Sequence, residues 1–333
     1  MKSSYKIPVP LPFELIRRIC NVNPLIINYH VVSDHKLSHV INLYNYRNTK
    51  IFSEDIDFIR KHYYPITLLE FLNSIKNKIS LPDNSVLLTF DDGFQEIFTT
   101  VAPILVDKKM PATFFLTEKF IDNRELGYDN KKSLIIEKLY EKGNEQIIHK
   151  IKDLPEFNKI PDNDITYSIL HIPYKKRQLV DKIGEILNIG FSDFLESNKP
   201  YLTSTQIHQL IDEGFTFGGH SIDHPRFSEL TLEEQIHQVI SSVLFLSDNF
   251  SLGYKVFAFP YSDGGVSLDL FRKISDHTDV TFGTHGLLHD IAENNYQRIS
   301  VEKFDQSALK TIKFHYSRKI LYKIFNKDVI KRK

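Results

Sequence analysis

The sequence predicts an α/β protein built on parallel β-strands, and two observations support this prediction. Short apolar segments rich in Val, Ile, Leu and Phe alternate with amphipathic segments along much of the chain, a pattern typical of strands followed by helices. Parallel strands need long crossover connections that are usually helical, so the alternation favours parallel pairing. Several apolar segments also end directly before Asp or His, where parallel strands bring their carboxyl ends to one edge.

The composition is that of an ordinary globular protein. The 333 residues can form one large domain with an insertion or two smaller domains. Hydrophobic residues make up 41% and charged residues 25%, which argues against extended disorder. Lys plus Arg equals Asp plus Glu at 42 each, so no overall charge favours nucleic acid as a partner. The single cysteine, Cys20, excludes an intrachain disulfide.

The first half of the chain contains an N-terminal arm and three of the expected strands. Residues 1–23 form the arm, and the core domain is expected over 24–305. A helix should start at Ser53, which we take as its N-cap, and another at Thr67. The remaining elements of this half are a strand at 24–30, a strand at 85–90, a helix at 97–109 and a strand at 111–116.

The alternation fails over residues 128–200, which are charged and contain helix-like segments, so we expect a partly helical insertion there. The pattern resumes at Thr203, an expected N-cap, and Thr231 begins the sequence of a capping box. The expected elements after the insertion are a helix at 206–213, a strand at 215–219, a helix at 231–247, a strand at 255–259, a helix at 267–274, and strands at 280–282 and 298–301.

The tail at 306–333 is strongly basic and contains an apolar stripe formed by Ile320, Leu321, Ile324 and Phe325. We expect a surface helix packed through that stripe, and the alternative is a basic amphipathic helix that contacts anionic lipid. Elsewhere no segment reaches the ~20 apolar residues of a membrane span, and prolines interrupt the N-terminus where a signal peptide would be apolar. The expected location is cytoplasmic, with peripheral contact to the inner membrane face through the tail as the alternative.

Two separated segments carry a candidate metal site. Asp91 and Asp92 follow a buried strand, and adjacent carboxylates are costly to bury without a compensating cation. His220 and His224 are four residues apart and can share one ion if the segment turns helically after Gly219. One carboxylate and two imidazoles leave positions open for water and substrate, as in catalytic sites. Such an ion lowers the pKa of its water, while a histidine can protonate a leaving group.

Three motifs resemble those of the NodB-homology polysaccharide deacetylases, which form carbohydrate esterase family four. Residues 88–93 (LTFDDG) resemble the first motif, 220–224 (HSIDH) the second, and 257–261 (FAFPY) the third. The resemblance implies a distorted (β/α) barrel of the NodB-homology type that removes acetyl groups from N-acetylated aminosugars with one divalent metal. Zinc is the ion favoured by one carboxylate and two imidazoles.

The resemblance also implies a role for each matching residue. Asp91 corresponds to the general base, and the backbone N–H of Tyr261 corresponds to the donor that stabilises the oxyanion. The three residues that correspond to the metal ligands are Asp92, His220 and His224.

Two departures from the family pattern concern the base and the acid. The arginine that usually opens the third motif is replaced by Ala258, and we hypothesise that Arg298 supplies the missing charge. Leu287–His289 matches the late motif that provides the acid in many members. However, the segment containing His30 resembles a subgroup of biofilm-polysaccharide deacetylases with permuted order, in which this first-strand histidine is the acid. We favour His30, with His289 as the alternative.

The sequence therefore predicts a metal-dependent N-deacetylase that acts on an N-acetyl-hexosamine in a glycan, a glycolipid or a sugar precursor. The insertion at 128–200 would form a cap or rim over the site. Two alternatives remain open. The same ligands could serve a metal phosphoesterase, and the missing arginine at Ala258 would also suit a catalytically silent carbohydrate-binding relative, although the intact ligand set counts against it.

Overall fold

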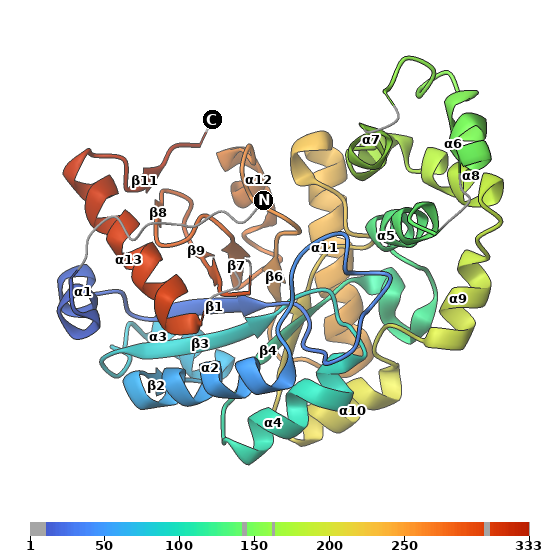
Figure 1. The fold of residues 1–333 in the computed structure, drawn as a ribbon. Coiled ribbons are helices and arrows are strands. Elements are labelled where there is room, and N and C mark those ends of the chain that lie inside the picture. The colour runs from blue at the N-terminus through green and yellow to red at the C-terminus, as the bar shows by residue number, and fades with distance from the viewer. Residues whose placement is uncertain (1–10, 142–144, 162–163, 303–306, 333) are drawn as a thin grey trace.

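The computed structural model describes residues 11–141, 145–161, 164–302 and 307–332, and its centre is a nearly closed barrel of parallel strands surrounded by helices (Figure 1). Neighbouring strands follow the order β10-β1-β3-β4-β5-β6-β7-β9, all parallel, with β2 added beside β3. The strands are β1 (Leu25–Tyr29), β2 (Tyr64–Pro65), β3 (Ser85–Phe90), β4 (Thr113–Leu116), β5 (Thr216–Gly219), β6 (Val256–Ala258), β7 (Val280–Gly283), β8 (His289–Asp290), β9 (Asn295–Gln297), β10 (Ile299–Ser300) and β11 (Val329–Ile330). The predicted α/β barrel is confirmed.

One short segment closes the barrel. Strands β9 and β10 are separated only by Arg298. The first half of the segment pairs with β7 and the second half pairs with β1, the first strand of the chain. The backbone of Arg298 also donates to Gly283 O at 3.1 Å. Arg298 therefore lies at the junction where the two edges of the sheet meet.

Helices connect successive strands from β1 to β7 and cover the outside of the barrel (Figure 1). The capping box predicted at Thr231 is confirmed, and the helix starts predicted at Thr67 and Thr203 prove to be capping boxes as well. The helix expected from Ser53 instead begins at Thr49, because the side chain of Asn48 accepts from the backbone of Ile51 at 2.8 Å. The helices are α1 (Phe13–Cys20), α2 (Thr49–His62), α3 (Leu68–Asn77), η1 (Ile97–Val101), α4 (Ala102–Asp107), η2 (Glu118–Asn123), α5 (Tyr128–Leu139), α6 (Glu145–Lys152), α7 (Ile165–Leu170), η4 (Tyr174–Lys176), α8 (Gln178–Ile186), α9 (Phe191–Asn198), α10 (Ser204–Asp212), η5 (Phe227–Glu229), α11 (Leu232–Phe250), α12 (Leu268–Ile274) and α13 (Ala308–Ile324).

Alternation along the strands separates two apolar clusters. Ile27 and Leu88 pack with the surrounding helices, whereas Ile26 and Leu87 belong to a second cluster that also contains β6 and β7 residues. Side chains two residues apart share a face of a strand. Asp91 therefore lies on the same face of the sheet as Leu87, at the carboxyl end of β3. This is the face on which Ile26 packs.

The helices α5–α9 lie together beside the barrel (Figure 1). Side chains of α5, α7 and α8 form an apolar cluster of their own, which includes Ile135, Ile169 and Ile183. The segment is thus helical, whereas its predicted limits at 128–200 and its role as a cap stay predictions. Residues 1–10 of the expected N-terminal arm and the boundary at 305 lie outside the described residues.

The tail forms α13, which packs against α1 and α2, but through a different face from the one predicted. Ala308, Ile312 and Tyr316 are buried, and Ile320 packs beside them. The expected stripe is wrong at its end, because Ile324 and Phe325 are each 65% exposed. Contact of the tail with anionic lipid stays a prediction. Within the described ranges, no helix has both the length and the apolar character that crossing a bilayer requires.

The segment after α13 ends in a buried ion cluster that sequence analysis did not predict. Strand β11 pairs with β8, and the side chain of Arg332, 2% exposed, lies between the carboxylates of Asp263 and Asp290. Its Nε donates to Asp290 Oδ1 at 2.7 Å, and its Nη1 donates to Asp263 O at 3.0 Å. The two carboxylates share one guanidinium away from water, and His285 Nδ1 lies 2.7 Å from Asp263 Oδ1 as a further partner.

We expect the Arg332→Ala variant to lose about 3–5 kcal/mol of its free energy of unfolding, because it leaves two carboxylates buried without their cation. Urea denaturation followed by circular dichroism measures this loss. The matched control is Lys331→Ala, since Lys331 is exposed beside it. Equal stability of the two variants would contradict the structural role of the cluster.

Candidate active site

The candidate site lies at the carboxyl ends of the barrel strands. Asp91 and Asp92 follow β3, His220 follows β5, and His30 follows β1. Since all of these strands are parallel, their carboxyl ends meet at one rim of the barrel. The structure therefore brings together residues that are up to about 190 positions apart in the sequence, as the strand pattern predicts.

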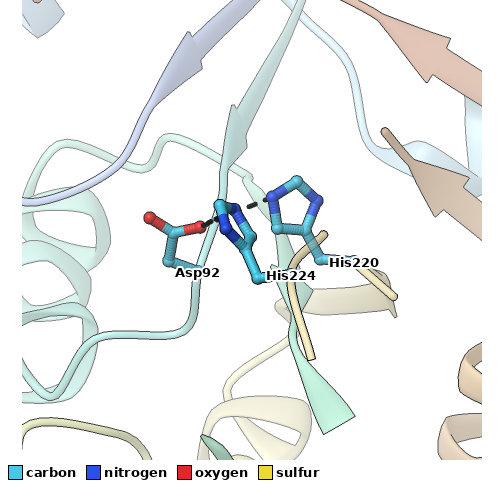
Figure 2. A group of neighbouring side chains, drawn as sticks. All are labelled: Asp92, His220 and His224. Carbon is cyan, nitrogen blue, oxygen red and sulfur yellow. Dashed lines mark ion pairs between the residues drawn. The ribbon is translucent and has the colours of Figure 1, made fainter. Parts of the chain in front are cut away.

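Asp92, His220 and His224 converge on one point (Figure 2). Asp92 Oδ1 lies 3.4 Å from His220 Nε2 and 3.1 Å from His224 Nε2. The predicted helical turn after Gly219 is wrong. Residues 220–226 form an irregular loop in which Ser221 and His224 have positive φ angles of 72° and 62°. The loop, rather than a helix, brings the two imidazoles to the same side.

The protonation of His220 indicates that a cation fits this group. His220 Nδ1 lies 2.8 Å from Ala258 O, and because a carbonyl only accepts, Nδ1 carries the proton. In the neutral imidazole, Nε2 then presents a lone pair toward Asp92 Oδ1. This buried oxygen has no hydrogen-bond donor among the described residues. The lone pairs of an imidazole and a carboxylate thus face one another, as they do in a pair of metal ligands. The hydrogen bond to Ala258 O fixes the tautomer of His220 that allows this.

Asp91 points toward Arg298 rather than toward the histidines. The guanidinium binds the carboxylate through both nitrogens, with Nη1 at 2.7 Å from Oδ1 and Nη2 at 2.8 Å from Oδ2. Asn28 Nδ2 donates to Oδ2 at 3.1 Å. Burial alone would raise the pKa of Asp91, but the charge of Arg298 outweighs it and lowers that pKa. Asp91 is therefore an oriented, ionised carboxylate.

His30 pairs with a carboxylate that sequence analysis missed. Its Nδ1 contacts Glu302 Oε1, and its backbone N–H donates to Glu302 Oε2 at 3.0 Å. Burial would lower the pKa of His30, but the buried Glu302 carboxylate raises it to about 9. His30 is thus held as an imidazolium at neutral pH. Glu302 follows β10, so the rule that active-site residues follow strands could have identified it.

The other two predicted residues differ in their placement. Tyr261 follows β6 with a positive φ of 56°, and its ring lies 4.7 Å from that of His224. Its hydroxyl contacts Asp129 of α5. His289, the alternative acid, is exposed on β8, where its backbone pairs with the C-terminal segment.

Tyr44, which donates to Asp92 Oδ2 at 3.2 Å, comes from an irregular segment without a recognisable signal in the sequence.

A cavity of about 940 Å³ joins these groups. Small-molecule sites range from roughly 300 to 1,000 Å³, so there is room for a sugar with a substituent. Its lining contains one metal-ligand pair, Asp92 and His224, beside Asp91, and it extends to α5 and α13. His289 is absent from the described residues that line it. His30, Tyr261 and Arg298 all contribute to the wall.

Solved structures share this fold. The Streptococcus pyogenes deacetylase PplD, in complex with acetate, is 16% identical with a TM-score of 0.54, covering 88% of this chain and 99% of that chain. IcaB from Ammonifex degensii is 15% identical, also with a TM-score of 0.54, covering 88% of this chain and 97% of its own. At such low identity the likeness concerns the fold alone.

A curated relative matches over a shorter stretch. The poly-beta-1,6-N-acetyl-D-glucosamine N-deacetylase of Escherichia coli (strain K12) is 31% identical over 75 residues, which are 22% of this chain and 11% of that protein. This chain thus matches only a small part of the relative's length.

The family model described as polysaccharide deacetylase matches much more of the chain, over residues 78–171 and 191–283. These ranges include Asp91, Asp92, His220, His224 and Tyr261, whereas His30 and Arg298 lie outside them. The matched residues make up more than half of the sequence and contain both halves of the candidate metal group. The chain therefore belongs to the polysaccharide deacetylase family.

Proposed function

We propose that the protein is a metal-dependent N-deacetylase that hydrolyses the acetamide of an N-acetyl-hexosamine. One observation supports this proposal most directly. The candidate ligands Asp92 and His224 line the same cavity as Asp91, a carboxylate that Arg298 orients. Amide hydrolysis needs a cation, a base and an acid around one water, and this arrangement offers a residue for each task.

Asp92, His220 and His224 would hold the ion, and zinc is the ion that we propose for one carboxylate and two imidazoles. A divalent cation bound there supplies a Lewis acid that lowers the pKa of water and polarises the acetyl carbonyl. Ala258 O orients His220 for this role, and Tyr44 holds the second oxygen of Asp92.

Protons are handled by two further residues. Asp91 accepts the proton of the attacking water, and Arg298 keeps this carboxylate ionised and in position. His30 donates a proton to the leaving amine, since Glu302 keeps the imidazole protonated at neutral pH. The amine would otherwise leave as an anion, which is a poor leaving group.

The tetrahedral oxyanion needs a fixed hydrogen-bond donor. We assign this role to the backbone N–H of Tyr261, whose conformation is held by Thr284 Oγ1 donating to Tyr261 O at 2.9 Å. The ring of Tyr261 also packs beside His224 and under the guanidinium of Arg226, at 3.8 Å from the ring centre.

The central test combines metal content with acetate release. We expect the protein to contain one divalent ion and to release acetate from N-acetylglucosamine oligosaccharides, and chelation to abolish this activity. Asp92→Asn should lose the metal and reduce turnover by more than about 100-fold. The control is His237→Ala, an exposed histidine outside the site. Release of phosphate from a phosphomonoester would instead favour the phosphoesterase. Glycan binding by a protein that contains no metal and releases no acetate would favour the catalytically silent relative.

The acid is tested by comparing two histidines at equal metal content. We expect His30→Ala to lower kcat by about 100–1,000-fold, because protonation of the leaving amine is lost. His289→Ala should retain kcat. In the wild type, kcat/KM should hold from neutral pH to about pH 9 and fall above it as His30 loses its proton. The reverse ranking of the two variants would assign the acid to His289.

Arg298 is tested with a substitution that keeps its charge. We expect Arg298→Lys to lower kcat by about 10–100-fold at unchanged KM and metal content, because lysine cannot bind both oxygens of Asp91. Thermal denaturation confirms that the variant is folded before its kinetics are compared. Unchanged turnover of a folded variant would show that Arg298 has no role in the reaction.

A further inference from the structure

The cavity has a second wall that the proposed chemistry does not use. This wall is formed by α13 and contains side chains at helical spacing, Phe314, Arg318 and Tyr322 on one row and His315 and Lys319 on the next. Residues four apart lie on the same side of a helix, so these rows form one face. The opposite face, with Ile312 and Tyr316, packs against the core.

The cationic groups on this wall lack the ion-pair partners that the acids of the cavity have. Each acid of the cavity lining already has a partner: Asp91 binds Arg298, Glu302 binds His30, Asp129 binds Lys132, and Asp92 belongs to the metal group. By contrast, within the described residues no carboxylate lies in ion-pair contact with Arg318 or Lys319. The α13 end of the cavity therefore has a surplus of positive charge.

Arg318 is held ready for a ligand. Its guanidinium lies 5.6 Å from the centre of the Phe314 ring and 5.1 Å from that of Tyr322, and it donates to the Tyr322 hydroxyl. Arginine has five donor hydrogens, so most of them remain for another acceptor. Cation–π contact with two aromatic rings restricts the side chain and so reduces the entropy that binding would cost.

Lys319 is placed beside the loop that faces this wall. Its Nζ donates to Leu287 O at 3.3 Å, which leaves two donors. The loop approaches α13 closely because Gly286 has a φ of 77°, and a Cβ there would lie 3.1 Å from His315 Nδ1. The loop at 286–287 therefore lies directly against the wall that contains these cations.

We propose that α13 forms an anion subsite, so that the substrate is an N-acetylated sugar carrying a phosphate group. The inference rests on the proposed function for the identity of the sugar. Arginine and lysine together are the usual recognition pair for phosphate oxygens. Because both line the cavity that contains Asp91 and Asp92, the anion belongs to the molecule being deacetylated. A flat bilayer surface could not reach side chains inside a cavity by itself.

The test measures binding and turnover separately with the chain of 333 residues. Isothermal titration compares N-acetylglucosamine 1-phosphate with N-acetylglucosamine. We expect the phosphorylated sugar to bind at least about tenfold more tightly, as one good charge-assisted contact allows. The double variant Arg318→Gln/Lys319→Gln should reduce this preference to about twofold. The matched control is Lys310→Gln, which removes an exposed charge of α13 outside the cavity.

Three further measurements distinguish recognition of a phosphate from recognition of a carboxylate or of a membrane. N-acetylmuramic acid tests a carboxylate, and tight binding of it in place of the phosphate would overturn the phosphate assignment. Sedimentation with vesicles of phosphatidylglycerol and phosphatidylcholine tests a membrane role. If the double variant loses only vesicle binding, the subsite is overturned. Acetate release from neutral N-acetylglucosamine oligosaccharides is measured in parallel.

The subsite and the proposed function fail in different ways. A phosphate preference that depends on Arg318 and Lys319, without acetate release from any sugar, supports the subsite and overturns only the deacetylase activity. Equal binding of neutral and phosphorylated sugars, together with acetate release that the double variant does not alter, overturns the subsite and leaves the deacetylase. Thermal denaturation of the double variant excludes a folding defect as the cause of lost binding.

Discussion

The buried ion pair between Arg298 and Asp91 connects the architecture of the barrel with its chemistry. Arg298 is 1% exposed and is the single residue between β9 and β10, the strands that close the barrel. Its guanidinium holds Asp91, while its backbone donates to Gly283 O at the end of β7 and the next residue, Ile299, pairs with Ile27 of β1. A buried carboxylate without its cation is strongly destabilising. The position of the carboxylate next to the candidate metal group thus depends on complete closure of the barrel.

The sequence predicts the parts of this protein that follow from local patterns. Alternating apolar segments predict the strands, and the residues directly after them predict most of the site: Asp91, Asp92, His220 and His30. Arg298 could be predicted because Ala258 occupies the position at which the third motif of the family usually has an arginine. The helix starts at Thr67, Thr203 and Thr231 are likewise local, and the sequence predicts all three correctly.

The remaining features depend on contacts that no local pattern describes. The loop of His220 and His224 uses two positive φ angles in place of a helical turn. The tail packs through Ile312 and Tyr316 because α1 and α2 lie on that side, whereas hydrophobicity alone favoured Ile324 and Phe325. Arg332 finds two acids from distant segments, Asp263 and Asp290. These outcomes require the assembled barrel, which determines what each surface meets.

Closure by the last strands also has a consequence for synthesis of the chain. Asp91 is made 207 residues before its partner Arg298, and β1 can pair with β10 only after residues 299–300 have been made. Until then β1 has one unpaired edge, which can capture other extended chains. Contacts between such distant residues also slow folding. A nascent barrel should therefore depend on chaperones that shield its first strand until residues 295–300 leave the ribosome.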